Sequence, residues 1–146
     1  MNQSYVLDTN ILLALVRGKA LGESIDKAYG LRSSLQRHTV SIASQVELYV
    51  LADRRQWGST KREAVRRMLE QVVVVPIDGQ GLVEAYVQIA NADYTWPAGS
   101  RNMGKNDIWI AATALFAGLP LLTTDKDFLF LNNNPIQVMW IDPMTA

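Results

Sequence analysis

The sequence predicts a single α/β domain in which helices flank both faces of a central parallel sheet. Short apolar segments alternate along the 146-residue chain with longer segments of helical periodicity. The apolar segments are nearly continuous rather than alternating with polar residues, which is typical of strands buried on both faces of a parallel sheet. No repeat, linker or low-complexity tract divides residues 1–146, so we expect one domain with its own core.

The N-terminal half of the chain contributes the first three strands. Residues 4–7 form a candidate strand that ends at the polar sequence Asp8-Thr9-Asn10. The other predicted strands of this half are residues 39–43 and 72–75, the latter a plain buried run of valines. The predicted helices are residues 11–18, 20–37, 44–55 and 60–71. Ser44 is the expected N-cap of the third of these helices.

The C-terminal half continues the same alternation. Residues 81–92 and 106–117 have helical spacing, and Gly118 is placed to close the second helix in a left-handed conformation. Between these helices, residues 94–105 contain proline and glycine and are expected to form a loop. Residues 119–124 and 136–141 complete the predicted sheet.

The charge and cysteine content limit the functions that the chain can have. Fourteen basic and fourteen acidic residues give no net charge, so a nucleic-acid substrate would need a local basic patch or metal ions. The absence of cysteine excludes disulfides, thiolate zinc sites and cysteine nucleophiles, and fits a reducing cytoplasm, where we expect the protein. The longest apolar run, residues 108–122, is too short to span a membrane, and we expect neither a membrane association nor a signal peptide.

Four acidic residues, far apart in sequence, are predicted to meet at one edge of the sheet. Asp8 and Asp125 follow the carboxyl ends of two strands. Asp107 begins a helix and Glu47 lies one turn into another, and both helices should start at that same edge. Ligands of open parallel sheets bind outside the carboxyl ends of the strands, so this edge is the candidate site.

Each of these acidic residues also has an ordinary local explanation. Glu47 and Ser44 match a capping box, and Asn106-Asp107 offers an N-cap for the helix that follows. Asp125 is suited to start a turn, and Asp8 to cap the first helix. None of these explanations accounts for their gathering at one edge.

A cluster of carboxylates must bind protons or a cation. Two carboxylates ~4 Å apart repel each other by about 4 kcal/mol at an effective dielectric constant of ~20. Ligands that are all oxygen atoms suit Mg²⁺ or Mn²⁺. Zinc is disfavoured because the chain has no cysteine and one histidine, His38, which we expect in a loop or at the surface. Such a site is suited to metal-assisted phosphodiester hydrolysis.

Two groups of basic residues are candidates for holding a phosphate backbone. Arg101 and Lys105 lie in the loop before Asp107, next to the acids, and are the stronger candidates. The other group is better explained as the solvated face of the middle helices, and it consists of Arg54, Arg55, Lys61, Arg62, Arg66 and Arg67. Trp96 either stacks on a base or anchors the loop.

Three segments together resemble a known family. They are LDTNILL from Leu7, the pattern SxxxxxE from Ser41 to Glu47, and NDIWIAATALFAGLPLLTTDKDF at 106–128. In this order they resemble PIN-domain ribonucleases, and most closely the VapC toxins of type II toxin–antitoxin pairs. The resemblance runs from about residue 4 to the end of the chain, with the middle helices contributing little.

The resemblance implies a Mg²⁺- or Mn²⁺-dependent endoribonuclease that cuts RNA with a metal-activated water. Its four acids fall on Asp8, Glu47, Asp107 and Asp125, of which Asp8, Asp107 and Asp125 are the implied metal ligands. Supporting positions fall on Asn10 and Thr123, and Asp127 competes with Asp125 for the fourth position. The family also implies a homodimer and a cognate antitoxin whose tail blocks the acidic site.

Three other interpretations remain open on the sequence. A PIN nuclease that matures RNA, rather than a toxin, would have the same residues. A phosphatase of the haloacid-dehalogenase type also has an aspartate after its first strand, but it needs a second carboxylate where this chain has Asn10. A non-catalytic RNA-binding protein would keep the fold without needing all four acids.

Overall fold

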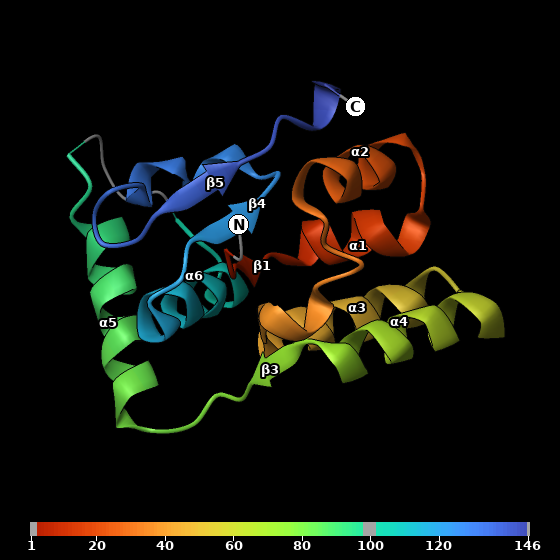
Figure 1. Cartoon of the computed structure of the whole chain (residues 1–146). Coiled ribbons are helices and arrows are strands. Elements are labelled where there is room, and N and C mark those ends of the chain that lie inside the picture. Colours follow the sequence, from red (N-terminus) through yellow and green to blue (C-terminus); the bar gives the residue numbers. More distant parts are fainter. Residues whose placement is uncertain (1–2, 98–101, 146) are drawn as a thin grey trace.

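The computed structural model describes residues 3–97 and 102–145, and in this part of the chain the predicted parallel sheet is confirmed (Figure 1). Five strands lie in the order β3-β2-β1-β4-β5, and every neighbouring pair is parallel. The strands are β1 Val6–Leu7, β2 Thr39–Ser41, β3 Val73–Val75, β4 Leu121–Thr123 and β5 Val138–Trp140. The first strand therefore lies in the middle, beside a strand that is more than 100 residues later in the sequence.

Six α-helices and three short 3₁₀ turns connect the strands in this part of the chain. The α-helices are α1 Thr9–Arg17, α2 Ala20–Tyr29, α3 Ile42–Arg54, α4 Ser59–Gln71, α5 Gln80–Tyr94 and α6 Lys105–Ala117. The 3₁₀ turns are η1 Leu35–Arg37, η2 Lys126–Leu131 and η3 Pro143–Thr145. Gly118 closes α6 with a φ of 67°, which confirms its predicted left-handed conformation.

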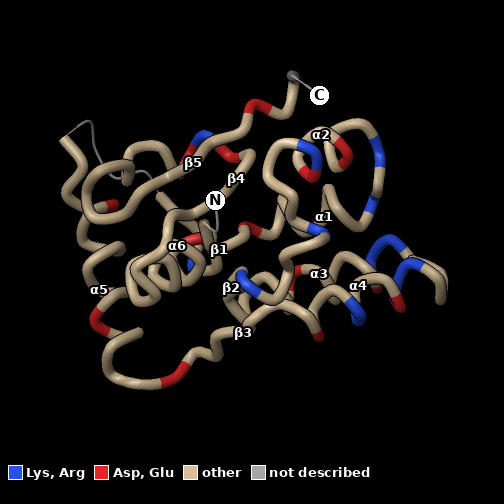
Figure 2. Tube along the Cα trace, in the orientation of Figure 1, with Lys and Arg blue, Asp and Glu red and all other residues tan. Residues whose placement is uncertain are grey.

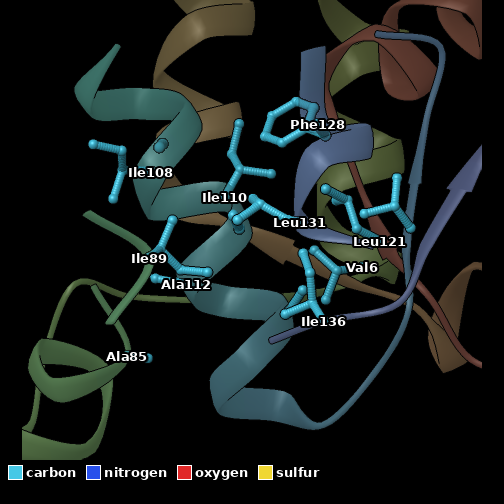
Figure 3. Packing of buried hydrophobic residues seen from close by; sticks show 14 of the residues in the cluster. Val6, Ala85, Ile89, Ile108, Ile110, Ala112, Leu121, Phe128, Leu131 and Ile136 are labelled. Carbon is cyan, nitrogen blue, oxygen red and sulfur yellow. The ribbon is translucent and has the colours of Figure 1, made fainter. Parts of the chain in front are cut away.

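Helices cover both faces of the sheet, as predicted. Successive strand residues point to opposite faces, so Val6 and Leu121 contribute to one core and Leu7 and Leu122 to the other. The first core lies between the sheet and α5, α6 and η2, and Figure 3 shows Phe128 and the α6 side chains closing over it. The second core lies against α1, α2 and α4. The helix α3 contacts α1 and α6 at the carboxyl edge of the strands.

Three local predictions were wrong. The helix predicted over residues 20–37 ends at Tyr29, because Gly30 adopts a left-handed conformation with φ 60°. The helix α3 begins at Ile42, two residues before the predicted range, because Ser41 rather than Ser44 is its N-cap and accepts a hydrogen bond from the N–H of Ala43. The run of valines is an edge strand, which leaves Val73 52% exposed.

His38 lies in the connection between η1 and β2, which confirms the predicted loop position, but it is not at the surface. It is 1% exposed, and its ring lies between two hydrogen-bond partners. The N–H of Tyr5 donates to Nδ1 at 3.2 Å, and Nε2 lies 2.9 Å from Oγ of Ser34. Because Nδ1 accepts, the ring proton is on Nε2 and points at the serine.

No helix in residues 3–97 and 102–145 is long and apolar enough to cross a membrane.

Candidate active site

The pairing of β1 with β4 places two site residues side by side. Leu7 lies opposite Leu122, and the N–H of Asp8 continues the ladder by donating to the carbonyl of Leu122 at 3.0 Å. Asp8 and Thr123 are thus the next residues at the carboxyl ends of adjacent central strands. This is the edge at which the sequence predicts the site.

Asp8 is held by hydrogen bonds to both of its carboxylate oxygens. Oδ1 accepts from the backbone N–H of Thr9 at 2.7 Å, and Oδ2 accepts from the hydroxyl of Thr123 at 2.6 Å. The residue is 3% exposed. Asp8 is therefore both the N-cap of α1, which was the ordinary explanation, and a fixed member of the site.

Thr123 links Asp8 to a second acid. While its hydroxyl proton points at Asp8, its oxygen accepts from the backbone N–H of Asp125 at 2.9 Å. Asp125 in turn caps the turn η2, because its Oδ1 accepts from the N–H of Asp127 at 2.9 Å. Asp125 lies two residues after the end of β4 and is half-buried, whereas Asp127 is exposed.

Glu47 is held at the site by Thr9, which was not among the predicted site residues. The hydroxyl oxygen of Thr9 lies 2.8 Å from Oε1 of Glu47 and 2.9 Å from Oγ of Ser44. A hydroxyl group has a single proton to donate, and a carboxylate accepts it more strongly than a serine oxygen. The prediction of a capping box between Ser44 and Glu47 is wrong, because Ser44 lies inside α3 and the N-cap is Ser41. A threonine next to the first aspartate was the available signal.

Asp107 lies in the first turn of α6 and faces the other acids. Gly104 occupies the N-cap position, so the interpretation of Asp107 or its neighbour as a cap is wrong. Asp107 lines a small pocket of about 180 Å³ together with Asp127, Phe128 and the segment 102–104. Its place in the first turn puts its charge near the positive end of the α6 dipole.

Burial and neighbouring carboxylates together disfavour the ionised forms of Asp8 and Asp107. Burial raises the pKa of Asp8 to about 7, and the charges of Asp107 and Asp125 add to this, against the two hydrogen bonds that favour its ionised form. Burial likewise raises the pKa of Asp107 to about 6, with further contributions from the charges of Glu47, Asp125 and Asp127. All the charges that shift these two acids are negative.

These residues fit an oxygen-ligated divalent cation in their chemistry. A divalent ion would relieve the repulsion that raises both pKa values, and the donor atoms are carboxylate oxygens. Within the described ranges no three acidic or histidine side chains lie close enough to enclose an ion directly. Mg²⁺ does not require such an enclosure, because it keeps several of its waters and takes only one or two carboxylates.

The remaining predicted residues have different surroundings. Asn10 is exposed on the first turn of α1, and no hydrogen bond joins its side chain to the four acids; its supporting role stays a prediction. Lys105 is the exposed first residue of α6, and Arg101 lies outside the described residues. Trp96 packs edge-on against Phe130 with ring centroids 5.2 Å apart, which favours the loop anchor over the base-stacking interpretation.

Comparison with known proteins assigns the family. The family model described as PIN domain matches residues 5–132. No curated protein matches the sequence. Among solved structures, a chain of the VapBC2 complex from Rickettsia felis, bound to a DNA fragment from its promoter, has a TM-score of 0.73 at 15% identity, with 96% of this chain and 100% of that chain covered.

Two further complexes have the same fold. A chain of DNA-bound VapBC from Salmonella typhimurium gives a TM-score of 0.73 at 18% identity, covering 94% of this chain and 97% of that one. A chain of VapBC-1 from nontypeable Haemophilus influenzae gives 0.69 at 24% identity, covering 94% and 98%. These likenesses establish the fold, and the family match covers most of the sequence. The chain belongs to the PIN domain family, whose members are nucleases.

Proposed function

We propose that the protein is a divalent-metal-dependent endoribonuclease and the toxin of a VapBC-type toxin–antitoxin pair. The observation that carries the proposal is the state of Asp8. It is a buried carboxylate, fixed by Thr9 and Thr123, whose nearest charges are further carboxylates. Such a group is strongly destabilised when ionised unless a cation joins it.

Each residue of the site has a distinct role in this proposal. Asp8, Asp107 and Asp125 would hold the cation, Mg²⁺ or Mn²⁺, either directly or through its bound waters. When bound, this cation supplies a water of lowered pKa and neutralises charge on the phosphodiester. Thr123 aims the carboxylate of Asp8, and Thr9 aims that of Glu47. Glu47 is then placed to accept a proton from the attacking water. The proposal includes a cytoplasmic location, where cellular RNA is available.

The partners in the proposal are an antitoxin and a second copy of the chain. The structural neighbours are VapBC complexes, so we infer a small cognate antitoxin that covers the acidic site. For the homodimer, α3 supplies an exposed apolar face formed by Val46, Tyr49 and Val50. Sedimentation of the wild-type protein and of Val46→Lys tests this face, with a shift from dimer to monomer expected.

Two alternatives use the same fold. A PIN nuclease that matures RNA would lack an antitoxin, and a small reading frame directly upstream of the gene would favour the toxin. A non-catalytic RNA-binding protein would not need four acids around Thr9 and Thr123. The phosphatase interpretation has no support from the family match.

The test is incubation of the purified full chain with total cellular RNA, with Mg²⁺ and with chelator, beside Asp107→Asn. Discrete fragments that require the metal and vanish in the variant are expected, and their ends would identify the target. Intact RNA in every lane, with a folded protein free of inhibitor, would overturn the nuclease and favour the binding protein.

A further inference from the structure

The basic residues of the chain fall into two classes. Most of the arginines on α4 are neutralised: Arg62 pairs with Asp53, and Arg66 and Arg67 pair with Glu63. Several other cations have no salt-bridge partner within the described residues. Four of them lie close enough together to interact, and we call them the basic cluster: Arg17, Lys19, Arg55 and Lys61. Figure 2 shows Lys and Arg gathered where the α1–α2 connection faces the α3–α4 connection.

The cluster is built by the end of α1 and the start of α4. Arg17, Lys19 and Lys61 line one open pocket of about 380 Å³, with Thr60 and Ala64 as its floor on α4. The ammonium of Lys61 lies 4.1 Å from the ring centroid of Trp57, which is half-buried against the core. A rigid aromatic ring therefore holds one of the cations in place.

The cations are close enough to act on one another. The pKa of Lys61 lies below its ordinary value because of partial burial and because of three neighbouring positive charges, those of Arg17, Arg55 and Lys19. Like charges held together in this way are unfavourable without an anion. An anion would stabilise the basic cluster, just as a cation would stabilise the acidic site.

A second hollow connects the basic cluster to the acidic site. It has a volume of about 280 Å³ and runs along α1 from Asn10 and Thr124 to Arg17 and Lys19. Thr124 lies between the site residues Thr123 and Asp125, so one end of the hollow borders the acids. Arg17 and Lys19 line both cavities, and Arg17, seven positions after Asn10, lies ~10 Å further along the helix axis.

We propose that the basic cluster binds the phosphates of single-stranded RNA that extends from the acidic site along α1. This inference rests on the proposed ribonuclease function and names how that substrate is held. A cluster of carboxylates repels phosphate, and the chain as a whole is neutral, so the backbone must be held by cations beside the site. The hollow along α1 joins the basic cluster to the edge of the acidic site, and no carboxylate forms a salt bridge with the cluster in the described residues.

An acidic peptide is the competing occupant, and the surroundings disfavour it. A larger groove of about 600 Å³, lined by Leu15, Leu35 and Met68, lies next to the cluster and has the apolar floor that a peptide needs. The cations on that groove, Arg32 and Arg67, already carry carboxylate partners. The unpaired cations lie instead on the path to the acids, where a polyanionic substrate has to pass.

The test measures RNA binding without cleavage. The wild-type full chain and two double variants are titrated with a fluorescein-labelled single-stranded RNA oligonucleotide, in chelator, over a range of salt concentrations. Arg17→Gln with Lys61→Gln removes two unpaired cations. Arg66→Gln with Arg67→Gln removes the same net charge from paired positions and is the matched control. Circular dichroism confirms that each variant is folded.

The expected result is specific to the first double variant. Each phosphate contact in single-stranded RNA contributes about 0.7 to the slope of log affinity against log salt, so the slope falls by about 1.4 and the affinity at low salt falls on the order of tenfold or more. In the cleavage assay KM rises and kcat is unchanged. The control keeps the wild-type slope and KM.

The other outcomes separate the two proposals. Equal slopes and affinities in both double variants, with wild-type cleavage intact, would overturn the basic cluster and leave the ribonuclease standing. RNA bound through the cluster but never cleaved in Mg²⁺ would overturn the ribonuclease alone. Capture of an oligoglutamate peptide that depends on Arg17 and Lys61, with RNA binding independent of them, would assign the cluster to an acidic peptide and overturn this inference.

Discussion

The hydroxyl of Thr123 lies 2.6 Å from Oδ2 of Asp8, across two neighbouring strands and 115 residues of sequence. The same hydroxyl oxygen accepts from the N–H of Asp125, so one side chain sets the positions of two acids. Both Asp8 and Thr123 are buried, which makes this hydrogen bond part of the core as well as of the site.

Replacing Thr123 with valine tests that link. The shape of the side chain is kept, but a buried carboxylate loses a donor and the N–H of Asp125 loses its acceptor. We expect the free energy of unfolding to fall by about 1–3 kcal/mol and cleavage to be lost almost entirely. Thr123→Ser keeps the hydroxyl and serves as the control. If Thr123→Val cleaved RNA as fast as Thr123→Ser, the proposed role of the hydroxyl would be contradicted.

Thr9→Val separates the positioning of Glu47 from that of the metal ligands. The variant removes the hydroxyl that lies 2.8 Å from Glu47, while the backbone N–H of Thr9 still donates to Asp8. We expect cleavage to fall by about 10- to 100-fold, the usual effect of losing a residue that orients a metal-site group. Mg²⁺ affinity, measured by calorimetry on the metal-free protein, is expected to stay near that of wild type. A large loss of affinity would show that Thr9 acts on the cation site instead.

The sequence predicted the edge of the sheet and, through the family resemblance, the supporting position of Thr123, but it did not predict the role of Thr9. The positions of Asp8 and Asp125 follow from strand ends, and a parallel sheet brings such ends together whatever the exact pairing. The contact of Thr9 with Glu47 depends on where α3 begins, and the choice between Ser41 and Ser44 as its cap is decided by tertiary packing. The exposure of Val73 depends on strand order, which apolar runs do not encode.

Asp8→Asn is expected to change the pH dependence of stability in the metal-free protein. The pKa of Asp8 is about 7 in the folded state against 3.8 for a free side chain, so the folded state binds the extra proton between these values. The stabilisation is fully present below about pH 4 and is lost as pH rises to 7. Urea denaturation should show this fall in wild type and a weaker one in Asp8→Asn, whose cleavage is abolished.

Mg²⁺ provides the matched control for that experiment. A cation that binds only the folded protein stabilises it by mass action, so added Mg²⁺ should raise the stability of wild type at pH 7. The asparagine variant should gain much less. Identical pH profiles for the two proteins, or equal stabilisation by Mg²⁺, would contradict a buried Asp8 that faces a cation.

His38 is expected to have the opposite effect to Asp8 on the pH dependence of stability, because it destabilises the folded protein as pH falls. Burial lowers its pKa, and the charge of Arg37 lowers it further, so the folded state disfavours the protonated ring. A protonated Nδ1 would also meet the N–H of Tyr5, which donates to it in the structure. The stabilisation is therefore complete above the unfolded pKa of about 6.5 and is lost as pH falls through the folded pKa.

Because His38 is the sole histidine of the chain, its imidazole resonances can be followed by NMR in the wild-type protein without assignment by mutation. A titration midpoint below 6.5 is expected. A midpoint at or above 6.5 would mean that the ring accepts a proton in the folded core, and that its bonds to Tyr5 and Ser34 do not persist in solution.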